Sequence, residues 1–185
     1  MRASEVDTET PKIRISLTTA SASALLLGLL ALGGCGKPVS RSQGNLPVDR
    51  ILVLKREHRL ELLSRGDLIK AYQVALGRAD GAKVMAGDHK TPQGLYEVDS
   101  KLSHSRFHKA LHISYPNASD IVRARHLGVN PGGAIEIHGL PWYFAWVGGA
   151  QHLVDWTDGC IAVSNSQIDE IWKLVPTGTP VEIRP

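Results

Sequence analysis

Short apolar runs, separated by turn residues, fill most of the chain from residue 50 onward. Runs of this length, bounded by glycine, proline, aspartate or asparagine, are typical of strands rather than helices. The pattern predicts strands at residues 51–54, 60–63, 68–76, 95–98, 111–114, 134–137, 161–163 and 179–183. Glu57, His58 and Arg59 form the expected turn between the first two strands.

Two segments carry a helical pattern instead. One helix is predicted from Ser119 to about Arg125, with Gly128 at its end. The other begins with a capping box, Ser164 and Gln167, and stops at Pro176. Its apolar face is formed by residues at i, i+3, i+4 and i+7, namely Ile168, Ile171, Trp172 and Val175.

Many short strands, two small helices and no regular βαβ alternation predict a mainly β domain over residues 50–185. We expect a β-sandwich or a partly closed barrel with short helices at its edges. Residues 103–109 are polar and basic, and we expect an excursion between strands that lines a groove. Residues 35–49 lack an apolar period and predict a flexible linker.

Residues 1–34 have the features of an export signal. Lys12 and Arg14 precede an apolar run that ends in Leu-Gly-Gly-Cys at Cys35. This ending resembles a bacterial lipobox, which implies lipid on Cys35; a plain signal peptide or an uncleaved anchor is the alternative. By resemblance to lipoprotein sorting, Gly36 implies the outer membrane. We therefore expect a periplasmic protein held to a membrane by lipid.

The net charge and the spacing of possible ligand residues indicate which kinds of molecule or ion the protein could bind. The net charge is +3 and the isoelectric point about 9.0, a mild basic balance that is compatible with anionic cell-wall polymers. No dense basic run with interleaved aromatic residues indicates nucleic acid. A zinc site from His138, His152, Cys160 and an aspartate is conceivable, but His-x-x-x-His and Cys-x-x-Cys spacings are absent, so we expect no metal and no cofactor.

Cys160 and His138 are the candidate catalytic pair. A thiol attacks a carbonyl as its thiolate, and a neighbouring imidazole is the usual activator. Gly159 allows a sharp turn before the cysteine, and its backbone N–H is a candidate donor to an oxyanion. If Cys35 carries lipid, Cys160 is the one thiol left and no disulfide can form. The alternatives are a small buried cysteine and a core histidine.

Three ordered motifs carry a family resemblance. His138-Gly139, followed by residues 157–161 (Thr-Asp-Gly-Cys-Ile) and Asn165, resembles the signature of the YkuD-type L,D-transpeptidases of bacterial cell walls. Residues 87–96 are similar to the family's Thr-Pro-x-Gly-x-Tyr strand entry, and residues 111–116 to its next strand. The resemblance covers roughly residues 50–183. Two positions depart from it: the family usually has His at Asp158 and Arg at Ala162.

The resemblance implies a mechanism and a substrate, the stem peptides of peptidoglycan. Cys160 would attack the third, diaminopimelate-type residue of a tetrapeptide stem and expel D-alanine, with His138 as general acid and base. The backbone carbonyl of Gly139 would orient the imidazole, with Asp155 and Asp158 as side-chain alternatives. Candidates for substrate contact are Asp158, Asp155, Trp156, Thr157 and Tyr115, and more weakly His152, His89, His104, Arg106 and His108.

The aromatic residues and the acyl acceptor each have more than one interpretation. Trp142, Tyr143, Phe144, Trp146 and Trp156 form an aromatic cluster that is either a lid over the cleft or plain core. The acyl acceptor is a second stem peptide, a lysine of an envelope protein, or water, which would make the protein an L,D-carboxypeptidase. A non-catalytic wall-binding lipoprotein is the alternative from another functional class.

Overall fold

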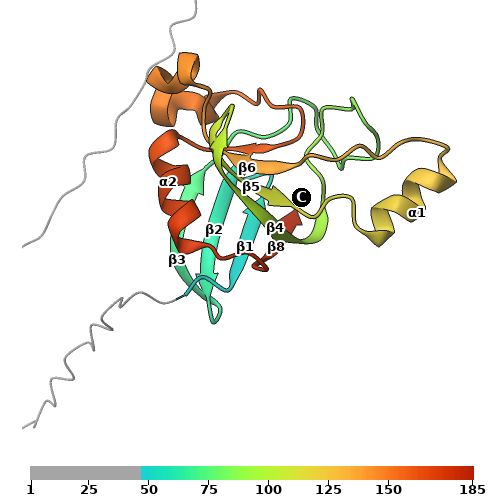
Figure 1. Ribbon diagram of the computed structural model, residues 1–185. Helices are drawn as coiled ribbons and strands as arrows, with labels where there is room; N and C mark the ends of the chain where they lie inside the picture. Colours follow the sequence, from blue (N-terminus) through green and yellow to red (C-terminus); the bar gives the residue numbers. More distant parts are fainter. Residues whose placement is uncertain (1–46) are drawn as a thin grey trace, which may run out of the picture. The chain divides into compact units, whose positions relative to one another are not determined.

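A computed structural model describes residues 47–185 of the chain. Eight strands form one mixed sheet in the order β3-β2-β1-β8-β4-β5-β6-β7 (Figure 1). They are β1 (Arg50–Leu54), β2 (Arg59–Ser64), β3 (Asp67–Gln73), β4 (Gly94–Ser105), β5 (His108–Ile113), β6 (Glu136–His138), β7 (Ile161–Ala162) and β8 (Pro180–Arg184). The predicted mainly β fold with short helices is confirmed.

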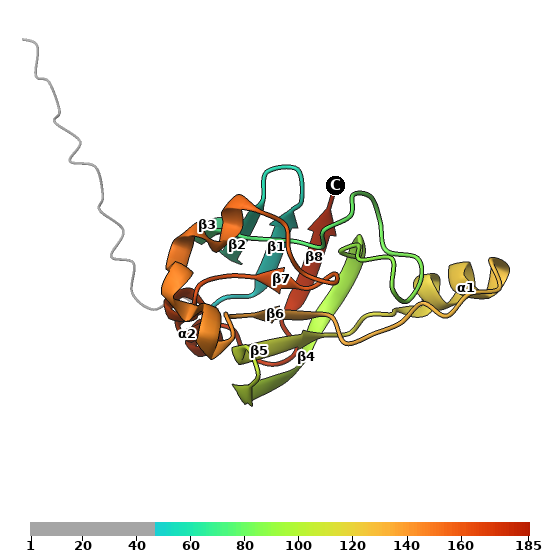
Figure 2. The ribbon, with the colours of Figure 1, turned by 90° about the horizontal axis from the view of Figure 1, so that it is seen from above.

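The two ends of the sheet approach each other. Ala75, just after β3, and Ala162, in β7, exchange two backbone hydrogen bonds of 3.0 and 2.8 Å. Figure 2 shows β6 and β7 running across the direction of β1 and β8, so the sheet is strongly curved. Of the two expected architectures, the single sheet therefore corresponds to the partly closed barrel.

The core lies on the concave face of this sheet, where alternate strand residues are fully buried, among them Ile51, Val53, Ile137 and Ile161. Helix α2 (Asn165–Leu174) packs against β5. Its predicted capping box is present, because Ser164 and Gln167 exchange side-chain-to-backbone hydrogen bonds. The two hydrogen bonds satisfy backbone groups that the first helical turn would otherwise leave free.

Helix α1 (Ala118–His126) lies far from α2 in both views (Figures 1 and 2). Its capping box is made by Asn117 and Asp120, which places its start one residue before the predicted Ser119. Asp120 also accepts a hydrogen bond of 3.0 Å from the Tyr96 hydroxyl. This bond ties the helix to β4.

Three local predictions were wrong or incomplete. Residues 103–109 are not an excursion: β4 continues to Ser105, which pairs with His108, so a hairpin turns at residues 106–107. β3 ends at Gln73, because Ala75 leaves β2 and pairs with β7 instead. A 3-10 helix, η1 (Trp142–Leu153), occupies a segment for which no element was predicted.

The predicted signal, Cys35 and nearly all of the predicted linker lie outside the described residues. Within residues 47–185, no helix is both long and apolar enough to cross a membrane.

Candidate active site

His138 and Cys160 lie on one face of the β6–β7 strand pair. The strands are parallel, with Ile137 opposite Ile161 and His138 opposite Ala162. Both isoleucines are fully buried in the core. His138 follows Ile137 on β6 and Cys160 immediately precedes β7, so strand alternation places their side chains on the other face. They are diagonal neighbours, within roughly 8 Å at the backbone, a separation that side chains can bridge.

The imidazole of His138 is fixed in one tautomer. Its Nδ1 lies 2.7 Å from the carbonyl oxygen of Gly139, which can only accept, so Nδ1 carries the proton. Burial lowers the pKa of His138 to about 4, although the hydrogen bond to Gly139 acts in the opposite direction. At neutral pH the ring is therefore uncharged and Nε2 has a free lone pair.

Two aromatic rings enclose this imidazole. Phe107, at the turn between β4 and β5, stacks on it with centroids 4.3 Å apart, and Trp156 meets it edge-on at 5.8 Å. The ring is 1% exposed as a result. Gly139 is needed beside it, because a Cβ there would lie 2.5 Å from the Asn165 side-chain oxygen.

The Cys160 thiol is partly exposed and uncharged. Burial is the main cause that raises its pKa to about 11; the carboxylates of Glu136 and Asp158 raise it further, while the Glu136 N–H and Lys83 lower it. Its Sγ lies 3.6 Å from the Ala134 carbonyl oxygen. Among residues 47–185 no hydrogen bond joins Sγ to the imidazole of His138.

The turn before the cysteine differs from the prediction in one respect. Gly159 has a φ of 126° and lies against Lys90, whose carbonyl oxygen would be 2.6 Å from an added Cβ, so only glycine fits. Its N–H, however, donates to Thr157 Oγ1 at 3.1 Å. The predicted role of the Gly159 N–H as a free oxyanion donor is therefore not supported, because this donor is already used.

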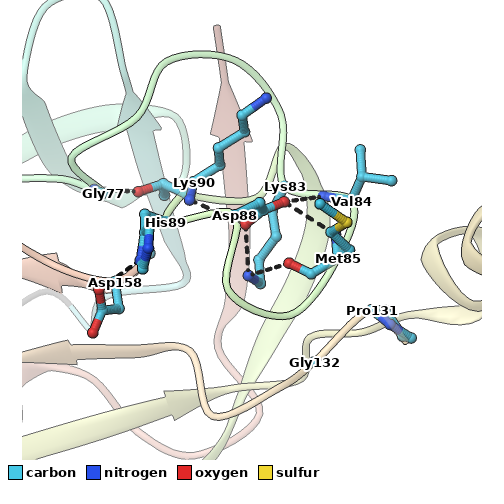
Figure 3. Close-up of polar contacts among 12 residues, drawn as sticks. Gly77, Lys83, Val84, Met85, Asp88, His89, Lys90, Pro131, Gly132 and Asp158 are labelled. Atoms are coloured by element: carbon cyan, nitrogen blue, oxygen red, sulfur yellow. Dashed lines mark hydrogen bonds and ion pairs between the residues drawn. The ribbon is translucent and has the colours of Figure 1, made fainter. Parts of the chain in front are cut away.

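A charged rim lies beside the cysteine. Asp158 is exposed and pairs with Arg78 at 2.8 Å. It also pairs with His89 Nδ1 at 2.8 Å (Figure 3). The three side chains come from two segments, residues 77–91 and 157–160, which also pair at Gly77 and Thr157. The structure thus brings the candidates His89 and Asp158 together. Arg78, which was not predicted from the sequence, joins them.

Residues 83–90 are held by a buried ion pair. Lys83 and Asp88, whose side chains are 4% and 7% exposed, lie 2.9 Å apart (Figure 3). Burial by itself would raise the pKa of Asp88, but hydrogen bonds from the Val84, Met85 and Lys90 N–H groups and from Lys83 lower it to about 2. This network fixes the segment that carries His89 to the rim.

Three predicted substrate contacts are used inside the protein. Tyr115 is 3% exposed and donates to the Pro131 carbonyl, so no substrate reaches it. Thr157 is buried and bonds the Cys160 carbonyl at 2.8 Å. Asp155 accepts from the Leu76 N–H and pairs with His58 at 2.9 Å, and so cannot orient His138. The hydrogen bonds of Tyr115 and Asp155 are long-range and have no signal in the sequence.

The remaining candidates lie nearby or on adjacent elements. Trp156 packs against the imidazole, and its Nε1 donates to Gln151. His152 bonds the Gly149 carbonyl within η1. His108 pairs with Asp169 of α2, and Arg106 lies over the Phe107 ring. His104 bonds its neighbour Ser103 on β4.

Glu136 and Phe107 were not predicted as site residues from the sequence. Glu136 precedes His138 by two residues on β6, so strand alternation alone puts it on the same face, and it lies opposite Cys160. Its half-buried carboxylate has a raised pKa, mainly through burial, and accepts no hydrogen bond from the described residues. Phe107 reaches His138 through the pairing of β5 with β6, which the sequence does not reveal. No group of three His, Cys, Asp or Glu residues within 47–185 could hold a metal ion.

Comparison with known proteins gives consistent matches. The family model YkuD, described as the L,D-transpeptidase catalytic domain, matches residues 48–183. The Escherichia coli (strain K12) protein named "Putative L,D-transpeptidase YafK" is 29% identical over 158 residues, which are 80% of this chain and 56% of that protein. The chain thus spans little more than half the length of this curated relative.

Solved structures show the same fold. A variant of the helical cell shape determining protein Pgp2 from Campylobacter jejuni matches with a TM-score of 0.58 and 26% identity, over 75% of this chain and 47% of that one. Bd1075 of Bdellovibrio bacteriovorus matches with a TM-score of 0.55 and 25% identity, over 75% and 48%.

Proposed function

The chain belongs to the YkuD family of L,D-transpeptidase catalytic domains, and from this premise we propose that it is a peptidoglycan acyltransferase whose acyl-enzyme forms on Cys160. The observation that carries the proposal is the fixed tautomer of His138. Because Nδ1 donates to the Gly139 carbonyl, Nε2 is the nitrogen that can accept a proton. The imidazole lies on the same sheet face as the partly exposed thiol of Cys160. Such a pair suits general-base activation of a nucleophile.

The first half-reaction starts from two neutral groups. Sγ of Cys160 attacks the carbonyl carbon of the third residue of a tetrapeptide stem while its proton passes to Nε2 of His138. Because the thiol pKa is near 11 and the imidazole pKa near 4, this transfer accompanies attack instead of preceding it. The C–N bond then breaks, the imidazolium protonates the departing D-alanine amine, and a thioester remains.

The tetrahedral oxyanion needs a backbone donor. Since the Gly159 N–H is bound to Thr157, the N–H of Cys160 itself is the donor that we propose. A donor of this kind is typically worth about 3 kcal/mol of transition-state stabilisation.

The thioester is released by an acceptor, and the acceptor sets the biological role. An amine of a second stem gives a 3→3 crosslink, and a lysine of an envelope protein gives wall attachment. Water gives L,D-carboxypeptidase activity, and the carboxylate of Glu136 favours this second candidate, because it is half-buried beside Cys160 and could orient a water. We further propose that the protein acts in the periplasm and that lipid on Cys35 anchors it to the outer membrane.

Intact mass after incubation with a tetrapeptide muropeptide or a carbapenem tests the proposal. We expect a covalent adduct on the unmodified protein and none on Cys160→Ala. Cys35→Ala is the matched control, since it removes the other cysteine of the chain and should keep the adduct. An adduct that survives Cys160→Ala, or no adduct with any ligand, would overturn the proposal. Released products distinguish crosslinking from trimming.

A further inference from the structure

Helix η1 exposes three large aromatic side chains to solvent. Trp142 is 85% exposed, Trp146 82% and Tyr143 60%. Contiguous exposed apolar surface of this kind usually marks a binding site. These residues lie in the connection between β6, which carries His138, and β7, which Cys160 precedes.

An unbroken series of ring contacts joins this surface to His138. Trp146 meets Phe144 at 6.2 Å, Phe144 meets Trp156 at 6.2 Å, and Trp156 meets His138 at 5.8 Å. Trp142 and Tyr143 contact each other at 5.8 Å, so the exposed rings and His138 belong to one region of the molecule. The aromatic cluster is neither a closed lid nor plain core, since its inner rings pack and its outer rings face water.

A groove of about 350 Å³ adjoins Trp142, between η1 and the turn of the β4–β5 hairpin. Its other walls carry hydrogen-bonding side chains of mixed type: Ser105, Arg106, His108 and Asn165. The Asn165 side-chain oxygen accepts a hydrogen bond from the Leu140 N–H at 2.6 Å. The amide nitrogen of Asn165 is therefore the group that can donate to a ligand. The groove thus combines an indole wall with several donors.

We propose that this groove and the exposed rings of η1 bind the sugar strand of peptidoglycan, that is, N-acetylated amino sugars. A pyranose ring presents polarised C–H groups on its face, which suit the electron-rich face of an indole, and hydroxyl and acetamide groups at its edge, which suit the polar walls. The inference rests on the proposed function and extends it from the stem peptide to the strand that carries the stem.

A membrane surface is the competing partner for exposed tryptophans. Interfacial helices usually place lysines and arginines beside the apolar face, but η1 has neither. The groove beside Trp142 also carries several polar side chains, so its lining and the composition of η1 favour the sugar.

The test compares two ligands on the inactive Cys160→Ala protein by calorimetry: a disaccharide tetrapeptide and the same tetrapeptide without sugar. We expect the sugar to tighten binding by about tenfold. In Trp142→Ala/Trp146→Ala the ratio of the two affinities should fall to about one, and Phe at both positions should keep part of it. Leu127→Ala, an exposed apolar residue at the end of α1, is the matched control and should leave the ratio unchanged.

Equal affinities for the two ligands, or a sugar preference that survives loss of both tryptophans, would overturn the inference. Tryptophan-dependent sedimentation with phosphatidylethanolamine and phosphatidylglycerol vesicles, without a sugar preference, would assign the surface to membrane instead. Failure of the proposed function has a different signature, since the active protein would then form no Cys160 adduct with either ligand.

Discussion

At the scale of single residues, the electrostatics of Cys160 explain how a thiol can be stored in a partly open site. Burial and two carboxylates keep the pKa well above that of a free thiol, so the group stays protonated and weakly reactive until a substrate arrives. Of the two carboxylates, that of Glu136 has the larger effect on the thiol pKa.

The alkylation rate of Cys160 by iodoacetamide should therefore keep rising about tenfold per pH unit well beyond the pKa of an ordinary thiol, near 8.5, without levelling off. Glu136→Gln removes a negative charge, which lowers the thiol pKa, and should speed alkylation at about pH 8 by roughly threefold, or half a pKa unit. Glu57→Gln, an exposed carboxylate in the β1–β2 turn, is the control. A wild-type rate that is already flat below pH 8 would contradict this account.

Candidate site residues could be predicted where they stand in a motif of recognisable spacing. The hydrogen-bond partners of those residues could not be predicted. His138, Gly139 and Cys160 stand in sequence motifs, and the structure puts histidine and cysteine on one sheet face. Nothing in the sequence shows that the Gly159 N–H is taken by Thr157, or that Tyr115 finds an internal acceptor. Such hydrogen bonds depend on three-dimensional contacts.

At the scale of elements, the segment from residue 83 to 90 positions the rim of the site. It has no regular secondary structure of its own, and Asp88 replaces that structure by accepting hydrogen bonds from the Val84, Met85 and Lys90 N–H groups. The Lys90 carbonyl then packs on Gly159, and His89 pairs with Asp158. One buried carboxylate thus links this loop to the cysteine turn.

Asp88→Asn should lower the free energy of unfolding in urea by about 3 kcal/mol, because it leaves the ammonium of Lys83 buried without its counter-charge. Lys83→Met combined with Asp88→Asn should be less destabilised than Asp88→Asn alone, since no unpaired charge remains. Asp80→Asn, an exposed carboxylate in the same connection, should change stability by less than about 0.5 kcal/mol. Equal losses in all three variants would refute the assignment.

The sequence pattern was enough to predict most elements, including both helices and the capping box of α2, but not the capping box of α1. The pattern gave a wrong or missing prediction at two segments whose polarity does not match their structure. The polar end of β4 is a strand because it pairs with β5, and η1 forms in a stretch whose exposed aromatics resemble a core segment. At β4, pairing with another strand overrides the local polar pattern.

At the scale of the whole molecule, the last strand in the sequence is central in the sheet. β8 pairs with β1 in parallel and with β4 in antiparallel orientation, so it joins the β1–β3 half to the half that carries His138 and Cys160. Val181 and Ile183 are buried in the core. The sheet order could not be predicted from the strand positions, because this long-range pairing brings residues 51 and 181 together.

Removal of residues 179–185 should therefore abolish folding altogether instead of fraying one edge. Both halves would then expose an unpaired strand edge, and the core would lose two buried side chains, at a cost of about 3 to 6 kcal/mol from burial alone. That cost is a large part of the stability of a typical domain. Circular dichroism should show no cooperative melting for the shortened chain. Removal of Pro185 alone, which lies beyond β8, should leave the melting transition in place. A shortened chain that melts cooperatively and still forms the Cys160 adduct would show that the two halves of the sheet hold together without their shared strand.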